Sequence, residues 1–198
     1  MSIISNVTVV GTGVLGSQIA YQTAFHGYAV TAHDISDEII EKARGRFARL
    51  AELYKADGVA GAADGKADTA LSNIRLTSAL DDAVADADLV IEAVPEILDL
   101  KLAVYGELGE LAPARTIFAT NSSTLLPSDL KACTGRSDRF LALHYANRVW
   151  QHNTGEIMGT TDTDPAVLRR RCRIRQGQRT RADRKSRRRK RDTSSTPS

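Results

Sequence analysis

A glycine-rich turn near the N-terminus constrains the fold of this chain more than any other feature. Residues 6–10 form a short β-branched run typical of a buried parallel strand. The run leads into Gly11, Gly13 and Gly16 at the spacing G-x-G-x-x-G, and apolar residues at helical spacing follow up to Gly27. In such a strand–turn–helix unit the first glycine bends sharply, the second admits a closely approaching group, and the third lets the helix pack against the strand.

Strand-like and helix-like segments alternate from about residue 6 to residue 158. The longest helical segment, residues 36–58, is amphipathic, with Ser36 as its expected N-cap and acidic residues in its first turn. The Ala/Gly-rich residues 60–73 are expected to form a helical turn or a short helix. Further strands are expected at 28–34, 74–78, 88–95, 115–123, 139–147 and 155–160, and further helices at 79–87, 96–112 and 162–168. Repeated β-α-β units predict an α/β fold with a Rossmann-type, doubly wound, mostly parallel sheet and helices on both faces.

Asp34 ends the second expected strand, 18 residues after Gly16. A carboxylate at this place accepts hydrogen bonds from the adenosine ribose hydroxyls and repels a 2′-phosphate, while the helix N-terminus attracts a diphosphate. The spacing therefore predicts a dinucleotide site that takes NAD rather than NADP. The alternative is a glycine-rich turn that binds no dinucleotide, with Asp34 as a solvated strand end.

The charge of the chain divides sharply near residue 168. Residues 169–198 hold 14 Lys and Arg against 2 Asp and Glu, a net of +12, whereas residues 1–168 hold 13 against 22, a net of −9. The basic segment has one large aliphatic residue, Ile174, so it cannot bury enough apolar surface to offset the entropy of ordering. We predict an NAD-binding Rossmann domain over residues 1–168 and a disordered, arginine-rich tail over residues 169–198.

The composition disfavours several other classes of protein. Cys133 and Cys172 are too few for a disulfide framework and give no zinc-binding pattern, so we expect reduced thiols, a cytoplasmic protein and no metal site. No apolar run approaches the roughly 18 residues that a membrane span needs. The N-terminus has no basic segment before its first apolar run, which argues against a signal peptide.

Five segments, taken in order, resemble a known family. They read GTGVLGSQIA, DLVIEAVPE with Lys101 after it, TNSSTL, RFLALHYAN and NTGEIMG. Together they resemble the NAD-binding domain of L-3-hydroxyacyl-CoA dehydrogenases, particularly the 3-hydroxybutyryl-CoA group, over about residues 3–168. The resemblance implies NAD as cofactor, an acyl-CoA substrate, and oxidation of a (3S)-3-hydroxyacyl-CoA to a 3-ketoacyl-CoA, or the reverse, in fatty acid metabolism.

The resemblance also implies roles for individual residues. The positions matching the cofactor side of the family's cleft are Gly11, Gly13, Gly16, Asp34, Glu96, Lys101 and Asn121. The positions matching its catalytic and substrate side are His144 as the catalytic histidine, Glu156 as the acidic partner of that histidine, Ser123 beside nicotinamide and substrate, and Asn147 in the histidine segment.

These residue types suit the oxidation of a secondary alcohol. A histidine is a suitable base because its usual pKa lies near neutrality, and a carboxylate on its other nitrogen orients the ring and stabilises the imidazolium. A serine hydroxyl can hydrogen-bond the substrate oxygen. Without the resemblance, His144 would more often be a structural histidine, Glu156 a solvated acid and Ser123 a loop or cap serine. A non-catalytic NAD-binding module and a dehydrogenase for free hydroxyacids or sugar acids stay open as alternatives.

The sequence departs from the family pattern after Leu168, and also at Arg148, where proline or an acid is usual. The family continues with a helical domain that implies a homodimer and one wall of the acyl-CoA cleft. No segment here resembles that domain, so we expect impaired turnover. We interpret the abrupt change to arginine-rich sequence as a reading-frame shift or a gene fragment. The alternative is a basic tail that binds nucleic acid or another anionic surface non-specifically, through salt-sensitive phosphate contacts and without aromatic residues for base stacking.

Overall fold

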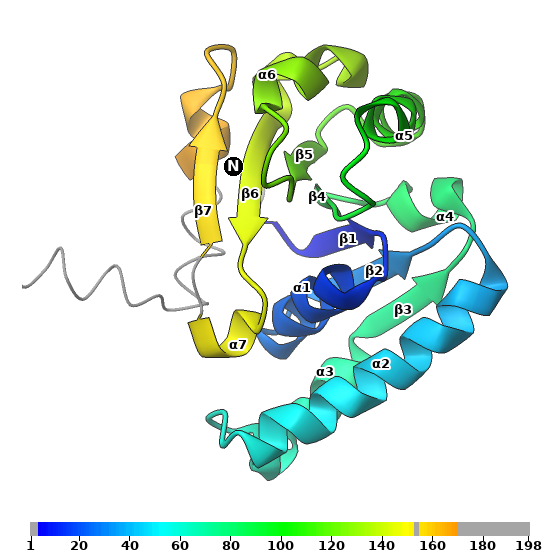
Figure 1. The fold of residues 1–198 in the computed structure, drawn as a ribbon, viewed down its shortest axis with the longest axis vertical. Helices are drawn as coiled ribbons and strands as arrows, with labels where there is room; N and C mark the ends of the chain where they lie inside the picture. Colours follow the sequence, from blue (N-terminus) through cyan, green and yellow to red (C-terminus); the bar gives the residue numbers. More distant parts are fainter. Residues whose placement is uncertain (1–3, 153–154, 170–198) are drawn as a thin grey trace, which may run out of the picture.

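The computed structural model describes residues 4–152 and 155–169. Within them, seven strands form one sheet in the order β3-β2-β1-β4-β5-β6-β7 (Figure 1). The strands are β1 Asn6–Val10, β2 Ala29–His33, β3 Ile74–Thr77, β4 Leu89–Glu92, β5 Ile117–Thr120, β6 Phe140–Tyr145 and β7 Gly155–Gly159. The first six are parallel, and β7 runs antiparallel to β6. The expected doubly wound, mostly parallel sheet is confirmed, whereas the expected disorder of the tail concerns residues that, from 170 on, lie outside the described part.

Helices cover both faces of this sheet. The helices whose apolar residues join the cluster on one face are α1 Val14–Phe25, α2 Asp37–Ala56, α3 Ala67–Ser72 and α7 Val149–His152. Those that join the cluster on the other face are α4 Leu80–Val84, α5 Leu98–Leu111 and α6 Pro127–Leu130. Short turns of other helix types lie at Ala62–Lys66, Lys131–Thr134 and Ser137–Arg139, and residues 165–169 are helical.

The central strands show why the sequence folds in two layers around the sheet. All four residues of β4 are buried, and Leu89 and Ile91 join one apolar cluster while Val90 joins the other. Side chains of a strand alternate between faces, so a continuous apolar run serves both layers of helices. Strand β5 repeats the pattern with Phe118 between two residues of the opposite face.

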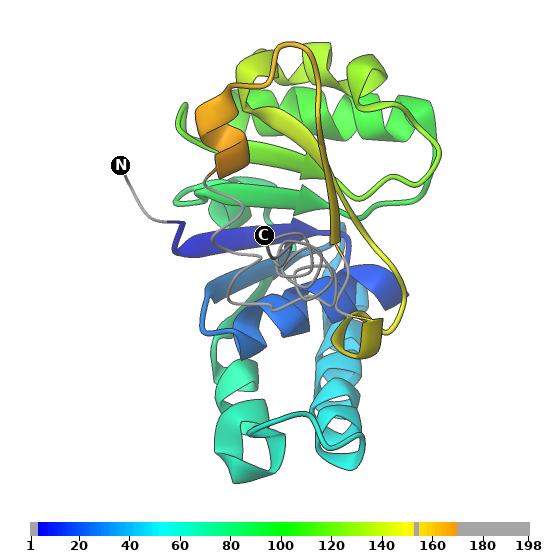
Figure 2. The same ribbon diagram turned by 90° about the vertical axis from the view of Figure 1, so that its left-hand side faces the viewer.

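The long helix α2 begins as the sequence predicts. The Ser36 hydroxyl accepts a hydrogen bond from the N–H of Ile39 at 3.4 Å, and Asp37 and Glu38 lie in the first turn. The chain then reverses and α3 packs back along α2, so that the pair extends away from the sheet as a helical hairpin (Figure 2). The expected long helix and the short one after it are both confirmed.

Candidate active site

The glycine turn joins β1 to α1 where the chain order of the sheet changes direction. β2 lies on one side of β1 and β4 on the other, and such a switch point is where open α/β sheets bind ligands. Gly11 has a φ of 95°, and a Cβ there would lie 2.7 Å from the carbonyl oxygen of Ala93. A Cβ on Gly16 would lie 1.9 Å from the carbonyl oxygen of Gly11. The packing of the turn itself therefore requires glycine at both places.

Gly13 differs from these two glycines, because a Cβ there would meet nothing within 4 Å. It is the N-cap of α1, and no acidic residue lies in the first turn of that helix. The first backbone N–H groups of α1 and the positive end of its dipole border the open space beside Gly13. A diphosphate binds to such an arrangement, so the residues present fit a dinucleotide.

Asp34 lies at the carboxyl end of β2, beside the glycine turn. Its Oδ2 accepts hydrogen bonds from the N–H and the hydroxyl of Thr12, both at 2.7 Å, and its Oδ1 accepts from the N–H of Ile35 at 2.9 Å. Arg46 of α2 donates to the carbonyl oxygen of Thr12 at 3.1 Å. The half-buried carboxylate is therefore held next to the turn, where a ribose bound against the turn would meet it.

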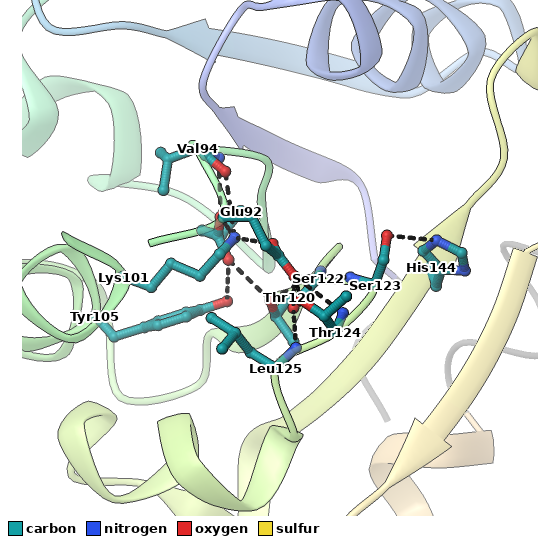
Figure 3. Close-up of polar contacts among 11 residues, drawn as sticks. Glu92, Val94, Lys101, Tyr105, Thr120, Ser122, Ser123, Thr124, Leu125 and His144 are labelled. Carbon is teal, nitrogen blue, oxygen red and sulfur yellow. Dashed lines mark hydrogen bonds and ion pairs between the residues drawn. The ribbon is translucent and has the colours of Figure 1, made fainter. Parts of the chain in front are cut away.

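Ser123 and His144 meet at the carboxyl ends of β5 and β6 (Figure 3). Ser123 Oγ lies 3.0 Å from Nε2 of His144. Glu156 on β7 is the direct register partner of His144, and its Oε2 lies 4.0 Å from the other ring nitrogen, Nδ1. The imidazole is half-buried, while the Glu156 side chain is 76% exposed. The structure thus places the imidazole between a hydroxyl and a carboxylate, one at each ring nitrogen.

Glu96 holds the loop that carries Ser123. Its Oε1 accepts hydrogen bonds from the N–H of Ser123 at 3.1 Å, from the N–H and the hydroxyl of Thr124, each at 3.0 Å, and from the hydroxyl of Ser122. Burial would raise the pKa of this carboxyl, but the hydrogen bonds from Ser122 and Thr124, helped by nearby Lys101, outweigh burial and lower the pKa from 4.5 to about 2. Glu96 is therefore fully ionised near neutral pH and acts as a fixed acceptor for the loop.

Lys101 lies beneath this loop and is 1% exposed. Its Nζ lies 2.5 Å from Oε1 of Glu92, 3.2 Å from the carbonyl oxygen of Val94 and 3.4 Å from Oε2 of Glu96. The structure thus brings Lys101 together with Glu96. A contact between Lys101 and a cofactor stays a prediction.

The two asparagines of the expected site lie in different surroundings. Asn121 is buried after β5, and its Oδ1 accepts a hydrogen bond from the N–H of Tyr145 at 2.9 Å, which ties β5 to β6. Asn147 is exposed in the turn after β6. Its neighbour Arg148 has a positive φ of 57°, and the N–H of Arg148 donates to Oε1 of Gln18 on α1 at 2.8 Å. The turn beside Asn147 is therefore held against the helix that begins at the glycine turn.

A model of the 3-hydroxyacyl-CoA dehydrogenase NAD-binding domain matches residues 6–181. The chain belongs to this family. The match extends beyond residue 168, where we expected the domain to end.

Curated relatives in the 3-hydroxyacyl-CoA dehydrogenase family include a probable 3-hydroxyacyl-CoA dehydrogenase of Caenorhabditis elegans, 34% identical over 85% of the chain and 55% of the relative. Another is the mitochondrial hydroxyacyl-coenzyme A dehydrogenase of Rattus norvegicus, 33% identical over 81% of the chain and 52% of the relative. The chain thus spans about half the length of these curated relatives.

Solved structures of related proteins share the fold of this domain. A diketoreductase that acts on dicarbonyl compounds superposes with a TM-score of 0.88 at 62% identity, over 91% of the chain and 63% of that protein. The (S)-3-hydroxybutyryl-CoA dehydrogenase of Ralstonia eutropha superposes with a TM-score of 0.81 at 28% identity, over 89% of the chain and 62% of that enzyme. The fold and the NAD-binding nature of the domain are therefore shown.

Glu92, Tyr105 and Thr120 were not predicted as site residues from the sequence. Glu92 is 0% exposed, and its Oε2 accepts hydrogen bonds from the hydroxyl of Thr120 at 2.8 Å and from the hydroxyl of Tyr105 at 3.3 Å. The signal that could have found it is an acidic residue inside the apolar run DLVIEAVP, because a buried carboxylate needs partners.

Metal and membrane features give no further site among the described residues. There, no group of three or more His, Cys, Asp or Glu side chains is arranged to hold a metal ion. No helix in residues 4–152 or 155–169 combines the length and the apolar character that crossing a membrane demands.

Proposed function

We propose that this domain oxidises the hydroxyl of a (3S)-3-hydroxyacyl-CoA to a ketone with NAD, or catalyses the reverse reduction. The observation that carries the proposal is the 3.0 Å contact between Ser123 Oγ and His144 Nε2, with Glu156 directly opposite the histidine. The three side chains lie at the same edge of the sheet as the glycine turn and Asp34. The residues proposed to bind the cofactor and those proposed to move a proton therefore share one edge of the sheet.

Each side chain has one task in this reaction. His144 takes the proton of the substrate hydroxyl through Nε2, or returns it during reduction. Ser123 hydrogen-bonds the substrate oxygen as its charge changes. Glu156, at 4.0 Å, acts on the imidazolium as an electrostatic partner, because this distance is too long for a hydrogen bond. NAD bound at the glycine turn supplies the hydride acceptor.

The remaining expected residues complete the proposed cleft. The open space at Gly13 admits the diphosphate, and Asp34 accepts hydrogen bonds from the ribose hydroxyls. Asn121 and Asn147 lie at the end of the site that takes the nicotinamide and the substrate. The acyl-CoA substrate, a homodimer formed through the family's helical domain and a cytoplasmic location belong to the same proposal. We expect the 198 residues by themselves to turn over substrate slowly, because the family's helical domain supplies one wall of the acyl-CoA cleft. A small misplacement of the reacting groups costs about a hundredfold in rate.

A second candidate substrate class is favoured by one observation. The diketoreductase is 62% identical to the chain, while the curated 3-hydroxyacyl-CoA dehydrogenases quoted above are 33–34% identical. Reduction of one ketone of a free dicarbonyl compound needs the same proton transfer at His144 and the same hydroxyl at Ser123. The substrate class therefore depends on what fills the rest of the cleft, and not on these two residues.

One assay distinguishes the candidates. NADH oxidation by the chain is followed with acetoacetyl-CoA and, separately, with 2,4-pentanedione, beside a His144→Ala variant as control. Activity on the thioester that His144→Ala lacks supports the dehydrogenase proposal, and activity on the diketone alone supports the dicarbonyl reductase. NADH binding without turnover of either compound overturns both in favour of a non-catalytic NAD-binding domain. Binding is measured by the fluorescence of the nicotinamide.

A further inference from the structure

Gln18 lies in the helix that begins at the glycine turn, and the residue is only 9% exposed. Its Oε1 accepts hydrogen bonds from the backbone N–H of Arg148 at 2.8 Å and from that of Val149 at 3.5 Å. These N–H groups lie at the start of α7, where a helix offers its own backbone donors no partner. Gln18 therefore caps α7 from the neighbouring helix α1, beside which α7 lies in Figure 1.

The capped residues connect α7 to β6, the strand that carries His144. Ala146, Asn147 and Arg148 alone separate the end of β6 from the start of α7. Arg148 has a φ of 57°, in the left-handed region that residues other than glycine rarely adopt. A residue keeps such a conformation where its surroundings hold it there. The hydrogen bond to Gln18 acts at this strained residue itself.

A second attachment holds the other side of α7. Oδ2 of Asp57, at the end of α2, accepts hydrogen bonds from Nε1 of Trp150 at 2.8 Å and from Nε2 of Gln151 at 2.6 Å. The ring of Trp150 also lies against the buried ring of Tyr54, with 5.1 Å between the centroids. The hydrogen bonds from Trp150 and Gln151 lower the pKa of Asp57, so the carboxylate is ionised at neutral pH. Helices α1 and α2 thus hold α7 from two places.

We infer that Gln18 is a positioning residue, which holds the turn of Asn147 against the helix that faces the cofactor. This inference rests on the proposed function, in which Asn147 lies at the nicotinamide and substrate end of the site. Without the Gln18 acceptor, the N–H groups of Arg148 and Val149 lose their partner in a poorly solvated place, and the turn moves away from α1. Asp57 still holds the far side of α7, so the turn is displaced and the domain stays folded. A displacement of about 1 Å near the reacting groups costs on the order of a hundredfold in rate.

The test compares two replacements of similar size. Gln18→Met keeps the length of the side chain and removes the acceptor, whereas Gln18→Glu keeps an acceptor in the same place. The quantities measured are kcat, KM, the Kd of NADH, amide hydrogen exchange at Arg148 and Val149, and the fluorescence of Trp150, the one tryptophan in the chain.

The two variants are expected to differ in turnover and not in cofactor affinity. For Gln18→Met we expect kcat to fall about tenfold or more and the Kd of NADH to change less than about twofold, because the glycine turn is untouched. Exchange at Arg148 and Val149 should become faster, and the emission of Trp150 should shift. Gln18→Glu should return kcat to within about threefold of the unmodified chain and slow the exchange again.

Gln22→Met is the matched control, because Gln22 is a buried glutamine one turn further along α1, and its Oε1 accepts from the hydroxyl of Tyr54. This variant also loses a buried acceptor, so its melting temperature should fall, while kcat and exchange at Arg148 stay within about twofold of the unmodified chain. Equal losses of kcat in Gln18→Met and Gln22→Met would overturn the inference. So would a kcat in Gln18→Met within about twofold of the unmodified chain, since Gln18 would then support the fold and not the geometry of the site.

Two further outcomes are assigned in advance. If Gln18→Met does not fold, Gln18→Asn decides, because it keeps the amide and withdraws its oxygen by one methylene group. A lower kcat with faster exchange at Arg148 supports the inference, and an unchanged kcat overturns it. If the unmodified chain turns over neither acetoacetyl-CoA nor 2,4-pentanedione, the proposed function fails, while the exchange and the Trp150 emission still decide whether Gln18 holds the turn.

Discussion

His144 and Glu156 face each other directly across the antiparallel pair of β6 and β7, with Nδ1 4.0 Å from Oε2. The pairing depends on register, because a slip of one residue would turn Glu156 to the opposite face of the sheet. β7 is the one antiparallel strand in the described sheet, so the acidic partner reaches the carboxyl edge of the parallel strands from the beginning of its own strand.

Glu156→Gln tests the electrostatic role of this pair. We expect kcat to fall about 10- to 100-fold, which is less than the roughly 10⁴-fold effect of a buried triad acid, because Glu156 is largely exposed to water. The Kd of NADH is expected to stay the same. Glu52→Gln, which changes an equally exposed glutamate on α2, is the matched control. An unchanged kcat in Glu156→Gln would show that the register pairing has no part in proton transfer.

Ser123→Ala tests the hydroxyl at 3.0 Å from the histidine. Removing one hydrogen-bond donor at the oxygen where charge develops is expected to lower kcat by about 10²- to 10³-fold, while NADH binding is retained. The measurement is steady-state turnover beside nicotinamide fluorescence. Ser128→Ala, at an exposed serine of α6, is the control and should behave like the unmodified chain. Equal kcat values for both variants would remove Ser123 from the chemistry.

The glycine turn and the place of Asp34 beside it could be predicted from the sequence because their constraints are local. Gly11 and Gly16 are required by the geometry of the turn that follows β1, and Asp34 directly follows β2 and accepts a hydrogen bond from that turn. The network of Glu92 and Lys101 could not be predicted in this way. It joins side chains from β4, β5 and α5, and no spacing along the chain encodes that meeting.

The catalytic half shows the same limit. The roles of His144 and Glu156 were predicted from the resemblance and not from their spacing in the sequence. Their pairing depends on the register between β6 and β7, which is fixed only when the two strands pair in the fold. The short helices α6 and α7 were also missed, because four residues carry too little periodicity to predict a helix. The alternation of strands and long helices was sufficient for the fold class.

Asp34→Ser tests the choice between coenzymes. The carboxylate repels a 2′-phosphate, and Arg46 lies close by with its guanidinium on the carbonyl oxygen of Thr12 at 3.1 Å. Replacing the carboxylate should weaken NADH binding and strengthen NADPH binding, so that the ratio of the two Kd values shifts about 10- to 100-fold toward NADPH. Both Kd values are measured by nicotinamide fluorescence. Glu41→Gln, which removes an exposed carboxylate of α2, is the control and should leave the ratio unchanged. An unchanged ratio of the two Kd values in Asp34→Ser would mean that this carboxylate does not contact the ribose.

Gly13→Ala separates cofactor binding from folding. The backbone of Gly13 has a φ of −60°, which alanine adopts readily, and a Cβ there meets nothing within 4 Å, so the melting temperature should not change. The added methyl group would occupy the space through which a diphosphate approaches the amides, so the Kd of NADH should rise about tenfold or more. Gly45→Ala within α2 is the control, also with open space around its Cβ, and should bind NADH normally. Normal binding by Gly13→Ala would place the diphosphate elsewhere.

His26 at the end of α1 makes the stability of the domain depend on pH. Burial, helped by nearby Lys66, lowers the pKa of this histidine from 6.5 to about 4. Between pH 6.5 and 4 the unfolded chain therefore binds a proton that the folded chain does not, so the contribution of His26 to stability is present above pH 6.5 and is lost as pH falls toward 4. In His26→Gln that loss should be absent, and the free energy of unfolding should fall less over this interval, by on the order of 1 to 2 kcal/mol after allowance for solvent screening. Urea unfolding of both proteins at several pH values between 4 and 7 measures the difference. Because the acidic residues titrate alike in the two proteins, parallel curves would show that the His26 ring is as easily protonated in the folded domain as in the unfolded chain.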